Sequence, residues 1–538
     1  MSVSAVRRIL IAPAVAAAAL TALALPSASA SVHPSATRVS SAGDVLTVGR
    51  HHGVAGDFRT IQAAVNHAAP GDTILIAPGD YHESATADAG VLIRTPDLHL
   101  VGMNRNRVVV DGTKASSPRP CASAAKWQRV TPDGRNGILV DRVSGVTIQN
   151  LTVCNYLTGS NTGEGGNEIW WNGGDATGTV GMGAWSGSYL TATATYYSDQ
   201  VHGQYGLFAS NASGPGRWFR TYASNMLDSD YYVGACRRQC HATLDHIRAQ
   251  NSALGYSGTN AGGRIVIEHS TFDHNRVGLA PNSLNNDDAP PPQDGSCPGR
   301  PTTPCMVIRD NRVFDNNQVS SPGGWAPIGV GIEIAGGRYD KVVGNHVWHQ
   351  GSWGILVNDF PDYETPPPIS HCEQSLADYT LPVLGMVPCY FPAFGNQVRD
   401  NVMTDNGWYG NLTNGDLAEA TSAAARTTMG YVDGNCWLGN GSANGTPASQ
   451  YPVLATKCGS MNSVDGLFDN GGLLLAEVAC ASVTDLTSTG CAALPPGEGY
   501  PVQTEVTLFP RPVNLMTKPH VCRSLPAGTG RATCRAWR

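Results

Sequence analysis

The chain has 538 residues, of which 62 are glycine and 14% are charged, and its formal net charge is −7. This composition favours tight turns and stacked strands over helices with charged surfaces. The acidic balance, without any basic run, argues against a nucleic-acid partner.

Residues 1–30 have the pattern of an export signal. Arg7 and Arg8 precede an apolar run over 9–25, and residues 28–30 form an Ala-Ser-Ala cleavage site. The arginine pair leaves twin-arginine export open beside ordinary secretion. No other stretch approaches the ~18 continuous apolar residues of a membrane span. We therefore predict a secreted, extracellular protein without membrane association once the signal is cleaved.

The segment after the signal is predicted to be a linker over 31–46, rich in Ser and Ala. A short helix is expected next, because Thr60 can act as the N-cap of an apolar face formed by Ile61, Ala64 and Val65. A stacked fold needs a cap over its open end. This helix is well placed to supply it.

Three strings stand at this point of the chain: Thr60-Ile61-Gln62-Ala63-Ala64-Val65, Pro70-Gly71-Asp72-Thr73-Ile74 and Pro78-Gly79-Asp80-Tyr81-His82-Glu83. They resemble the opening of pectate-lyase-like right-handed parallel β-helix proteins, an opening that pectin methylesterases share. The resemblance implies an all-β, right-handed parallel β-helix over 47–440. The opening caps the coils and carries no chemistry, so it implies the fold and leaves the activity open.

Six later stretches share one frame, in which a second apolar residue follows the first by five positions and a small or amide residue usually follows by three more. They are Ile148–Val153–Tyr156, Leu244–Ala249–Ser252, Ile267–Phe272–Asn275, Ile308–Val313–Asn316, Val343–Trp348–Gly351 and Val398–Met403–Asn406. A recurring step of about 23 residues predicts a solenoid. The 96 residues from Ile148 to Leu244 then correspond to four steps. Asn275, Asn316 and Asn406 are expected to form a structural ladder.

Long insertions interrupt the frame at 157–200, 282–304, 358–395 and 411–428. The last three leave the coil after the same element. Loops that leave stacked coils at equal points lie on one side and can form the wall of a groove. Such a groove suits a linear ligand, and we predict an extracellular polysaccharide partner.

The frame is lost after about residue 440, and 441–538 is predicted to be an irregular C-terminal tail stapled by disulfides. The chain contains 14 cysteines, and an even number in an exported chain indicates disulfides. The close pairs are Cys236/Cys240, Cys297/Cys305, Cys372/Cys389, Cys480/Cys491 and Cys522/Cys534. Half of a zinc site is the alternative for the first pair.

Glu333 is the best single candidate for acid/base chemistry. It lies between Ile332 and Ile334 in a predicted strand, so it faces outward if the isoleucines face the core. Lys341 is a second catalytic candidate, because the resemblance implies that lyases of this superfamily use Lys or Arg, often with Ca²⁺. Lys341 could equally be a surface charge.

The densest polar loop contains Asp287, Asp288 and Asp294. Such carboxylates can bind Ca²⁺, and Asp287 or Asp288 could share acid/base work with Glu333. The alternative is a solvated turn stiffened by the three prolines at 290–292.

The remaining candidates are substrate-binding residues. Trp170 and Trp171 could stack on sugar rings or bury their own loop on the coils. Asn282, Asn358 and Asn414 each stand four residues after a glycine, and Asp359 and Asp416 accompany them. These amides could line the groove or form another ladder.

The leading hypothesis is a carbohydrate-active enzyme acting by β-elimination of a polyuronate or by glycoside hydrolysis. The resemblance favours a lyase, whereas the acidic loops favour a hydrolase with two carboxylates. Of the polygalacturonase motifs only Asp287-Asp288 is present, and the ordered methylesterase motifs and the epimerase Asp-Pro-His are absent. A non-catalytic glycan-binding or adhesion protein is the alternative. The sequence gives no basis for an oligomeric state.

Overall fold

The computed structural model describes residues 43–538 without 176, 178, 237–239, 259–260, 262, 282–304, 363–388, 424–426, 428–432, 458–471, 484–490, 493, 524, 526–533 and 535–538. The predicted export signal therefore lies outside the described residues, as do Asn282, Asp287, Asp288 and Asp294.

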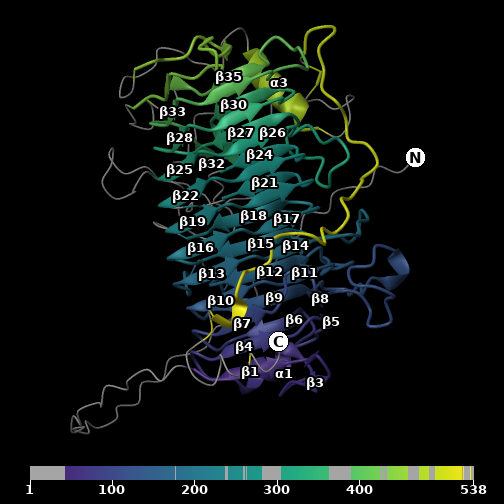
Figure 1. The fold of residues 1–538 in the computed structure, drawn as a ribbon. Coiled ribbons are helices and arrows are strands. Elements are labelled where there is room, and N and C mark those ends of the chain that lie inside the picture. Colours follow the sequence, from purple (N-terminus) through teal and green to yellow (C-terminus); the bar gives the residue numbers. More distant parts are fainter. Residues whose placement is uncertain are drawn as a thin grey trace, which may run out of the picture. The chain divides into compact units, whose positions relative to one another are not determined.

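Three long parallel sheets carry the fold, and each coil between the two ends adds one strand to every sheet (Figure 1). The first sheet contains β1 (Val45–Val48), β4 (Thr73–Ile76), β7 (His99–Gly102), β10 (Val146–Gln149), β13 (Trp185–Ser188), β16 (Gly216–Phe219), β19 (Ala242–Asp245), β22 (Ile265–Glu268), β25 (Met306–Arg309), β28 (Lys341–Val343), β33 (Gln397–Arg399) and β36 (Cys436–Leu438). The second contains β5 (Gly79–Tyr81), β8 (Val108–Asp111), β11 (Thr152–Cys154), β14 (Thr191–Thr193), β17 (Tyr222–Ser224), β20 (Arg248–Gln250), β23 (Thr271–Asp273), β26 (Arg312–Phe314), β29 (His346–Trp348) and β34 (Val402–Thr404). The third contains β6 (Ala89–Ile93), β9 (Asn136–Asp141), β12 (Asn167–Asn172), β15 (Tyr205–Ser210), β18 (Ser229–Gly234), β21 (Leu254–Ser257), β24 (Val277–Ala280), β27 (Val330–Ala335), β30 (Trp353–Asn358), β35 (Gly415–Ala420) and β37 (Gln450–Tyr451).

The strands pair in parallel with the equivalent strand one coil away, as β19 does with β22, β20 with β23 and β21 with β24. This arrangement is a parallel β-helix, so the predicted all-β parallel fold is confirmed. Connections between parallel strands are right-handed almost without exception. Two short antiparallel pairs stand apart from the coils, β2 (Arg50–His51) with β3 (Val54–Ala55) and β31 (Phe360–Asp362) with β32 (Cys389–Phe391).

The apolar frame lines the interior of the coils. Five of the six predicted frames place their first two apolar residues in the core at 0–2% exposure. The sixth is shifted by one residue, because Val342 and Val347 are fully buried, whereas Val343 and Trp348 are part-buried. Val342 pairs with the core residue Ile308 of the preceding coil. Two adjacent valines left the pattern unable to choose between these registers.

The stretch 157–200 was expected to be an insertion, and this is wrong, because it supplies β12, β13 and β14. The first sheet passes from Ile148 to Leu244 through Gly187 and Trp218, which makes three steps instead of four. Gly187 stands at a core position because ring atoms of Trp171 and Trp218 lie 3.0 Å from where its Cβ would be. This coil has a glycine where other coils have an aliphatic residue, and tryptophan rings fill the space. A search for aliphatic repeats therefore misses it.

The expected amide ladder runs along the turn between the second and third sheets. Asn275 Nδ2 donates to Asn316 Oδ1 at 3.2 Å, and the backbone N–H of Asn316 donates to Gln350 Oε1 at 3.1 Å. The N–H of Gln350 then donates to Asn406 Oδ1 at 3.1 Å. The prediction is confirmed, with a glutamine in the intervening coil. A further ladder joins Asn311, Asn345, Asn401 and Asn440 along the turn between the first and second sheets.

The helices are short. Helix α1 (Ile61–His67) begins after Thr60, whose hydroxyl accepts the N–H of Ala63, and its buried residues pack against β1, β4 and β6. Helix α3 (Leu473–Ala481) packs near the third sheet, and the described residues include the 3₁₀ turns η1 (Ala125–Trp127) and η4 (Val521–Arg523). In the described part of the chain, none of these helices has the length and apolarity needed to cross a membrane.

Residues 503–522 run back along the coils, and we call this segment the C-terminal strap (yellow in Figure 1). Gln503 bonds the carbonyl of Ser321 beyond β26, and Thr507 accepts from Asn251 beyond β20. Thr517 donates to Asn150 beside β10. The segment ends where Val521 and Cys522 pack on Leu75 of β4 and Val101 of β7.

Disulfides join Cys236 to Cys240, Cys480 to Cys491 and Cys522 to Cys534, as the spacing predicts. Because Cys236 and Cys240 are joined in a disulfide, they are not available as the half zinc site that was the alternative. A fourth disulfide, Cys121–Cys154, was not predicted because its cysteines are 33 residues apart in sequence. Cys297 and Cys372 lie outside the described residues, so the predicted pairs Cys297/Cys305 and Cys372/Cys389 stay predictions.

Candidate functional site

The third sheet is the one flanked by long connections on both sides. Turns from the first to the second sheet are two residues long in most coils, as at 246–247 and 269–270. The third sheet, in contrast, is entered through long connections such as 315–329 and left through others such as 281–305. Its outer face is therefore the face around which the chain concentrates its loops, where binding and catalytic residues are most often placed.

One row of outward-facing side chains runs along this face. Trp170 of β12 pairs with Phe208 of β15, which pairs with Tyr232 of β18. Ser257 and Ala280 continue the row on β21 and β24. Glu333 of β27 comes next. Leu279 pairs with Ile332, so the residues that follow them, Ala280 and Glu333, are neighbours in the row. Leu356 of β30 is the partner of Glu333. We call this the third-sheet row.

The aromatic end of the row is built by stacking. The rings of Trp170 and Phe208 are parallel, with an interplanar angle of 2° and centroids 5.0 Å apart, and Tyr232 meets Phe208 edge-on at 4.7 Å. Tyr205 adds a fourth ring, 4.6 Å from Phe208. Trp170 Nε1 donates to Ser210 Oγ at 3.0 Å, which fixes its orientation. Trp170, Phe208 and Tyr205 are part-exposed, whereas Tyr232 is 9% exposed. Part-exposed aromatic faces can pack on the apolar C–H surfaces of a sugar ring.

Glu333 is the carboxyl-bearing residue of the row. It faces outward between the fully buried Ile332 and Ile334, as the sequence predicts, and it is 8% exposed. Burial raises the pKa of its carboxyl to about 7, and a hydrogen bond from the Asn358 side chain acts in the opposite direction. A carboxyl with such a pKa is partly protonated at neutral pH and can give or take a proton there.

The other predicted residues near Glu333 have structural contacts of their own. Asn358 ends β30 and reaches Glu333 from the neighbouring coil. Asp359 Oδ1 accepts the N–H of Ala393 at 2.8 Å, and its Oδ2 accepts the N–H of Ser422 at 2.7 Å. Asp359 thus holds two connections together at the edge of the third sheet.

Asn414 and Asp416 are also engaged inside the protein. Asn414 Nδ2 donates to Glu477 of α3 at 3.1 Å and to the hydroxyl of Tyr500 at 2.8 Å. Asp416 accepts from Asn406 at 2.9 Å and from the N–H and hydroxyl of Ser449. These contacts dock α3 and the last coil, so neither side chain offers its main polar atoms to a ligand.

The two predicted tryptophans point in opposite directions. Trp171 is 0% exposed and packs in the interior with Trp185 and Trp218, so the expectation that its ring meets a sugar is wrong. Trp170 faces outward. Phe208 and Tyr232 were not predicted, although their positions in β15 and β18 match that of Trp170. The missed coil described above concealed this alignment.

Lys341 lies on β28 of the first sheet, whereas Glu333 lies on the third. The two side chains belong to different faces, so the structure does not bring these catalytic candidates together. Asp287, Asp288, Asp294 and Asn282 lie outside the described residues. Their segment follows β24, the strand beside the one that carries Glu333.

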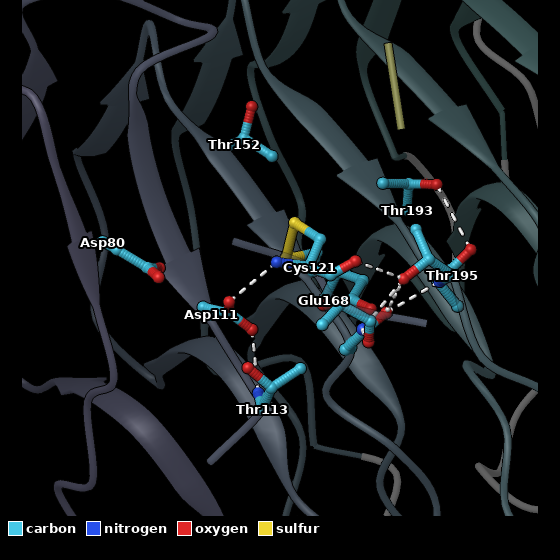
Figure 2. Close-up of a disulfide and its surroundings, with 12 residues drawn as sticks. Asp80, Asp111, Thr113, Cys121, Thr152, Glu168, Thr193 and Thr195 are labelled. Atoms are coloured by element: carbon cyan, nitrogen blue, oxygen red, sulfur yellow. Dashed lines mark hydrogen bonds between the residues drawn. A yellow bond between two sulfur atoms is a disulfide. The ribbon is translucent and has the colours of Figure 1, made fainter. Parts of the chain in front are cut away.

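A separate polar cluster lies on the outer side of the second sheet, beside the Cys121–Cys154 disulfide (Figure 2). Ligand atoms of Asp80, His82 and Asp111 lie within 4.8 Å of one another. Asp111, however, accepts the backbone N–H groups of Thr113 and Cys121, each at 2.8 Å. His82 Nδ1 contacts the carbonyl oxygen of Thr113 at 2.9 Å. Among the described residues this cluster chiefly holds the loop that carries Cys121.

A cavity of about 580 Å³ opens on the outer side of the first sheet. The residues that line it include Thr147, Ser186, Thr243 and Arg217. Its lining contains no part of the third-sheet row.

No protein-family model matches the sequence, and no curated protein does. Similar solved structures include the mannuronan C-5 epimerase AlgE4 A-module of Azotobacter vinelandii, with 12% identity, a TM-score of 0.38 and coverage of 74% of this chain and 95% of that one. The pectate lyase Pel9A has 12% identity, a TM-score of 0.32 and coverage of 59% and 69%. The Agl-KA catalytic domain has 13% identity, a TM-score of 0.37 and coverage of 70% and 50%. All these TM-scores are below 0.5, so the fold assignment rests on the strand pairing of this chain.

Proposed function

We propose that the protein is a secreted carbohydrate-active enzyme that binds an extracellular polysaccharide along the third-sheet row and uses Glu333 as its acid/base residue. The observation that carries this proposal is the shared register of the stacked aromatic side chains and Glu333. Tyr232 and Glu333 are three coils apart, about 14 Å at the usual strand spacing. Tyr232 is 9% and Glu333 8% exposed, so a linear chain along the sheet would meet both through small exposed areas.

Glycoside hydrolysis is the reaction that these residues support best. A protonated carboxyl can donate a proton to a leaving glycosidic oxygen, and the raised pKa of Glu333 keeps a large protonated fraction near neutral pH. A second carboxylate is required, and Asp287 or Asp288 stays the prediction for it. β-Elimination is less well supported, because Lys341 lies on another sheet. Calcium binding by Asp287, Asp288 and Asp294 likewise stays a prediction.

A non-catalytic glycan-binding protein is the second candidate. It is favoured by the small exposed fraction of Glu333, 8%, compared with the part-exposed rings of Trp170 and Phe208 in the same row. Stacking on Trp170 and Phe208 needs no proton transfer.

We also propose that α1 closes the first coil and that the C-terminal strap is a structural tie along the coils.

The deciding experiment is a panel of neutral and acidic polysaccharides incubated with the wild-type protein and with Glu333→Gln, with and without Ca²⁺. We expect new reducing ends without unsaturated-product absorbance, and a loss of about 10²–10⁴-fold in rate for the variant. The control is Glu268→Gln on the first sheet, which we expect to retain full activity. Unsaturated products would indicate a lyase instead. Retention of a glycan without any cleavage would leave the binding function.

A further inference from the structure

We propose that Asp245, His246 and His269 form a binding site for a divalent transition-metal ion. The site lies at the turn between the first and second sheets, away from the third-sheet row. One ligand atom from each of the three residues lies within 4.8 Å of the others. The proposal is independent of the polysaccharide function.

The coil architecture places the two histidines side by side. His246 and His269 occupy the same position of the two-residue turn in successive coils, and both have a left-handed backbone, with φ of 56° and 50°. Histidine adopts this conformation more readily than most residues. The turn is held by the N–H of His246 on the carbonyl of Glu268 and by the N–H of Ile247 on Ser270 Oγ. The ring centroids are consequently 5.4 Å apart.

Both imidazoles face the same carboxylate oxygen. Asp245 Oδ1 is 2.6 Å from His246 Nδ1 and 3.3 Å from His269 Nδ1. Metal–ligand bonds of about 2.1 Å in a tetrahedral arrangement would separate ligand atoms by about 3.4 Å. The second distance already matches this value. The first must lengthen by less than about 1 Å, which part-exposed side chains can accommodate.

The ligand set indicates the class of ion. Two imidazole nitrogens and one carboxylate oxygen suit Zn²⁺, Ni²⁺ or Cu²⁺, whereas Ca²⁺ and Mg²⁺ prefer sets of oxygen ligands. The histidine side chains are 46% and 48% exposed and that of Asp245 is 15% exposed. The site is therefore open to solvent, and a bound ion would keep positions for water or a small ligand.

Arg217 opposes the ion. Its Nη2 lies 3.4 Å from Asp245 Oδ2, the oxygen that does not face His269. The guanidinium competes for the carboxylate and repels a cation. Arg217 also lines the cavity on the first sheet, together with Thr243. Removal of this positive charge should therefore tighten metal binding. If the three residues were only hydrogen-bonded to one another and had no metal affinity, no such change would be seen.

The cluster of Asp80, His82 and Asp111 is the internal comparison. It also has three potential ligands within 4.8 Å, but Asp111 is occupied by two backbone N–H groups and His82 Nδ1 by a backbone contact. Both oxygens of Asp111 are therefore already used within the protein, whereas His82 Nε2 faces Asp80 Oδ2 at 3.3 Å. Binding at Asp245, His246 and His269 is therefore expected to be the stronger of the two.

The test is calorimetric titration of the full-length protein, without a histidine tag, with Zn²⁺, Ni²⁺ and Cu²⁺. We expect the double variant His246→Ala/His269→Ala to weaken binding at least about tenfold. His82→Ala should leave it unchanged, and Arg217→Gln should strengthen it. Circular dichroism and thermal unfolding would verify that each variant is folded, and His269→Gln serves as a milder second variant.

Three results would overturn the proposal. The wild-type protein could bind none of the three ions, or the double variant could bind them as tightly as the wild type. His82→Ala could alternatively abolish binding while the double variant retains it, which would assign the metal to the second sheet. Since none of these readouts involves a polysaccharide, failure here would not affect the role of Glu333.

Discussion

The outer faces of the third and first sheets are built by the same coils and yet carry different chemistry. The third-sheet face has long connections on both sides, stacked aromatic rings and one nearly buried carboxyl. The first-sheet face adjoins two-residue turns and carries hydroxyls and exposed ion pairs, such as Arg309 with Glu268. Both faces share the buried apolar rows. The interior thus determines the fold, while outward residues and connection lengths determine what each face can bind.

The largest effect that separates the two faces is expected in the pH dependence of stability. The pKa of Glu333 is raised from about 4.5 in the unfolded chain to about 7 in the folded protein. The folded state then favours the protonated carboxyl, so the contribution of Glu333 to stability is fully present below pH 4.5 and is lost as the pH rises through 7. Relative to Glu333→Gln, the wild type should lose about 3 kcal/mol across this window, to order of magnitude.

The measurement is urea unfolding of the wild type and of Glu333→Gln at pH 5 and pH 8, because the difference between the two proteins cancels the other titrating groups. Glu268→Gln on the first-sheet face, unfolded under the same conditions, is the control for the removal of a carboxyl. A constant difference between the wild type and Glu333→Gln would contradict the raised pKa of Glu333.

The second expected effect concerns the interior that both faces share. Asn345 Nδ2 donates to the carbonyl of Ile308 at 2.9 Å and to Asn401 at 3.0 Å, and its Oδ1 accepts from Asn311. Asn345→Ala leaves these buried groups without partners, and the free energy of unfolding should fall by about 2 kcal/mol. Asn440→Ala, at the part-exposed end of the same ladder, should cost less. Equal losses, measured by urea unfolding, would show that the ladder is not the cause.

The interior was more predictable from the sequence than the outer faces. Aliphatic residues at constant spacing indicated the coils. Asn275 and Asn316 indicated a ladder, because they occupy the same turn position in successive coils. Gly187 and the tryptophans that fill its position interrupted the repeat, so β12 to β14 and the alignment of Trp170 with Phe208 were missed. Glu333 was predicted because two isoleucines fix its direction.

Contacts made by distant segments could not be predicted from local patterns. Asn414 and Asp416 looked like loop residues available to a ligand, but Asn414 bonds Glu477 and Tyr500, more than 60 residues later in the chain. The Cys121–Cys154 disulfide likewise joins residues that are 33 positions apart, so local spacing did not indicate it. Sequence spacing identifies neighbours in a repeat, whereas docking of the tail depends on the completed surface.

A smaller effect should appear in glycan affinity. Trp170→Ala removes the ring that stacks on Phe208, and we expect about a tenfold rise in Kd, near 1.4 kcal/mol, for a glycan bound on the third-sheet face. Trp348→Ala is the matched control, because Trp348 stacks on Phe314 on the second sheet with centroids 4.3 Å apart. Affinity chromatography or calorimetry would measure both. An equal loss in the control would move the glycan to another face.

The smallest effect is expected on the first-sheet face itself. Arg309 Nε donates to Glu268 Oε2 at 2.7 Å, but the arginine side chain is 47% exposed, so water and salt screen the pair. Glu268→Gln should change the free energy of unfolding by less than about 1 kcal/mol, and 0.5 M salt should shrink even that difference. A loss as large as that of Asn345→Ala would mean that the coils depend on their surface charges as much as on their interior. The first-sheet and third-sheet faces would then differ in their contribution to the stability of the coils, because only the first-sheet face would stabilise them through ion pairs.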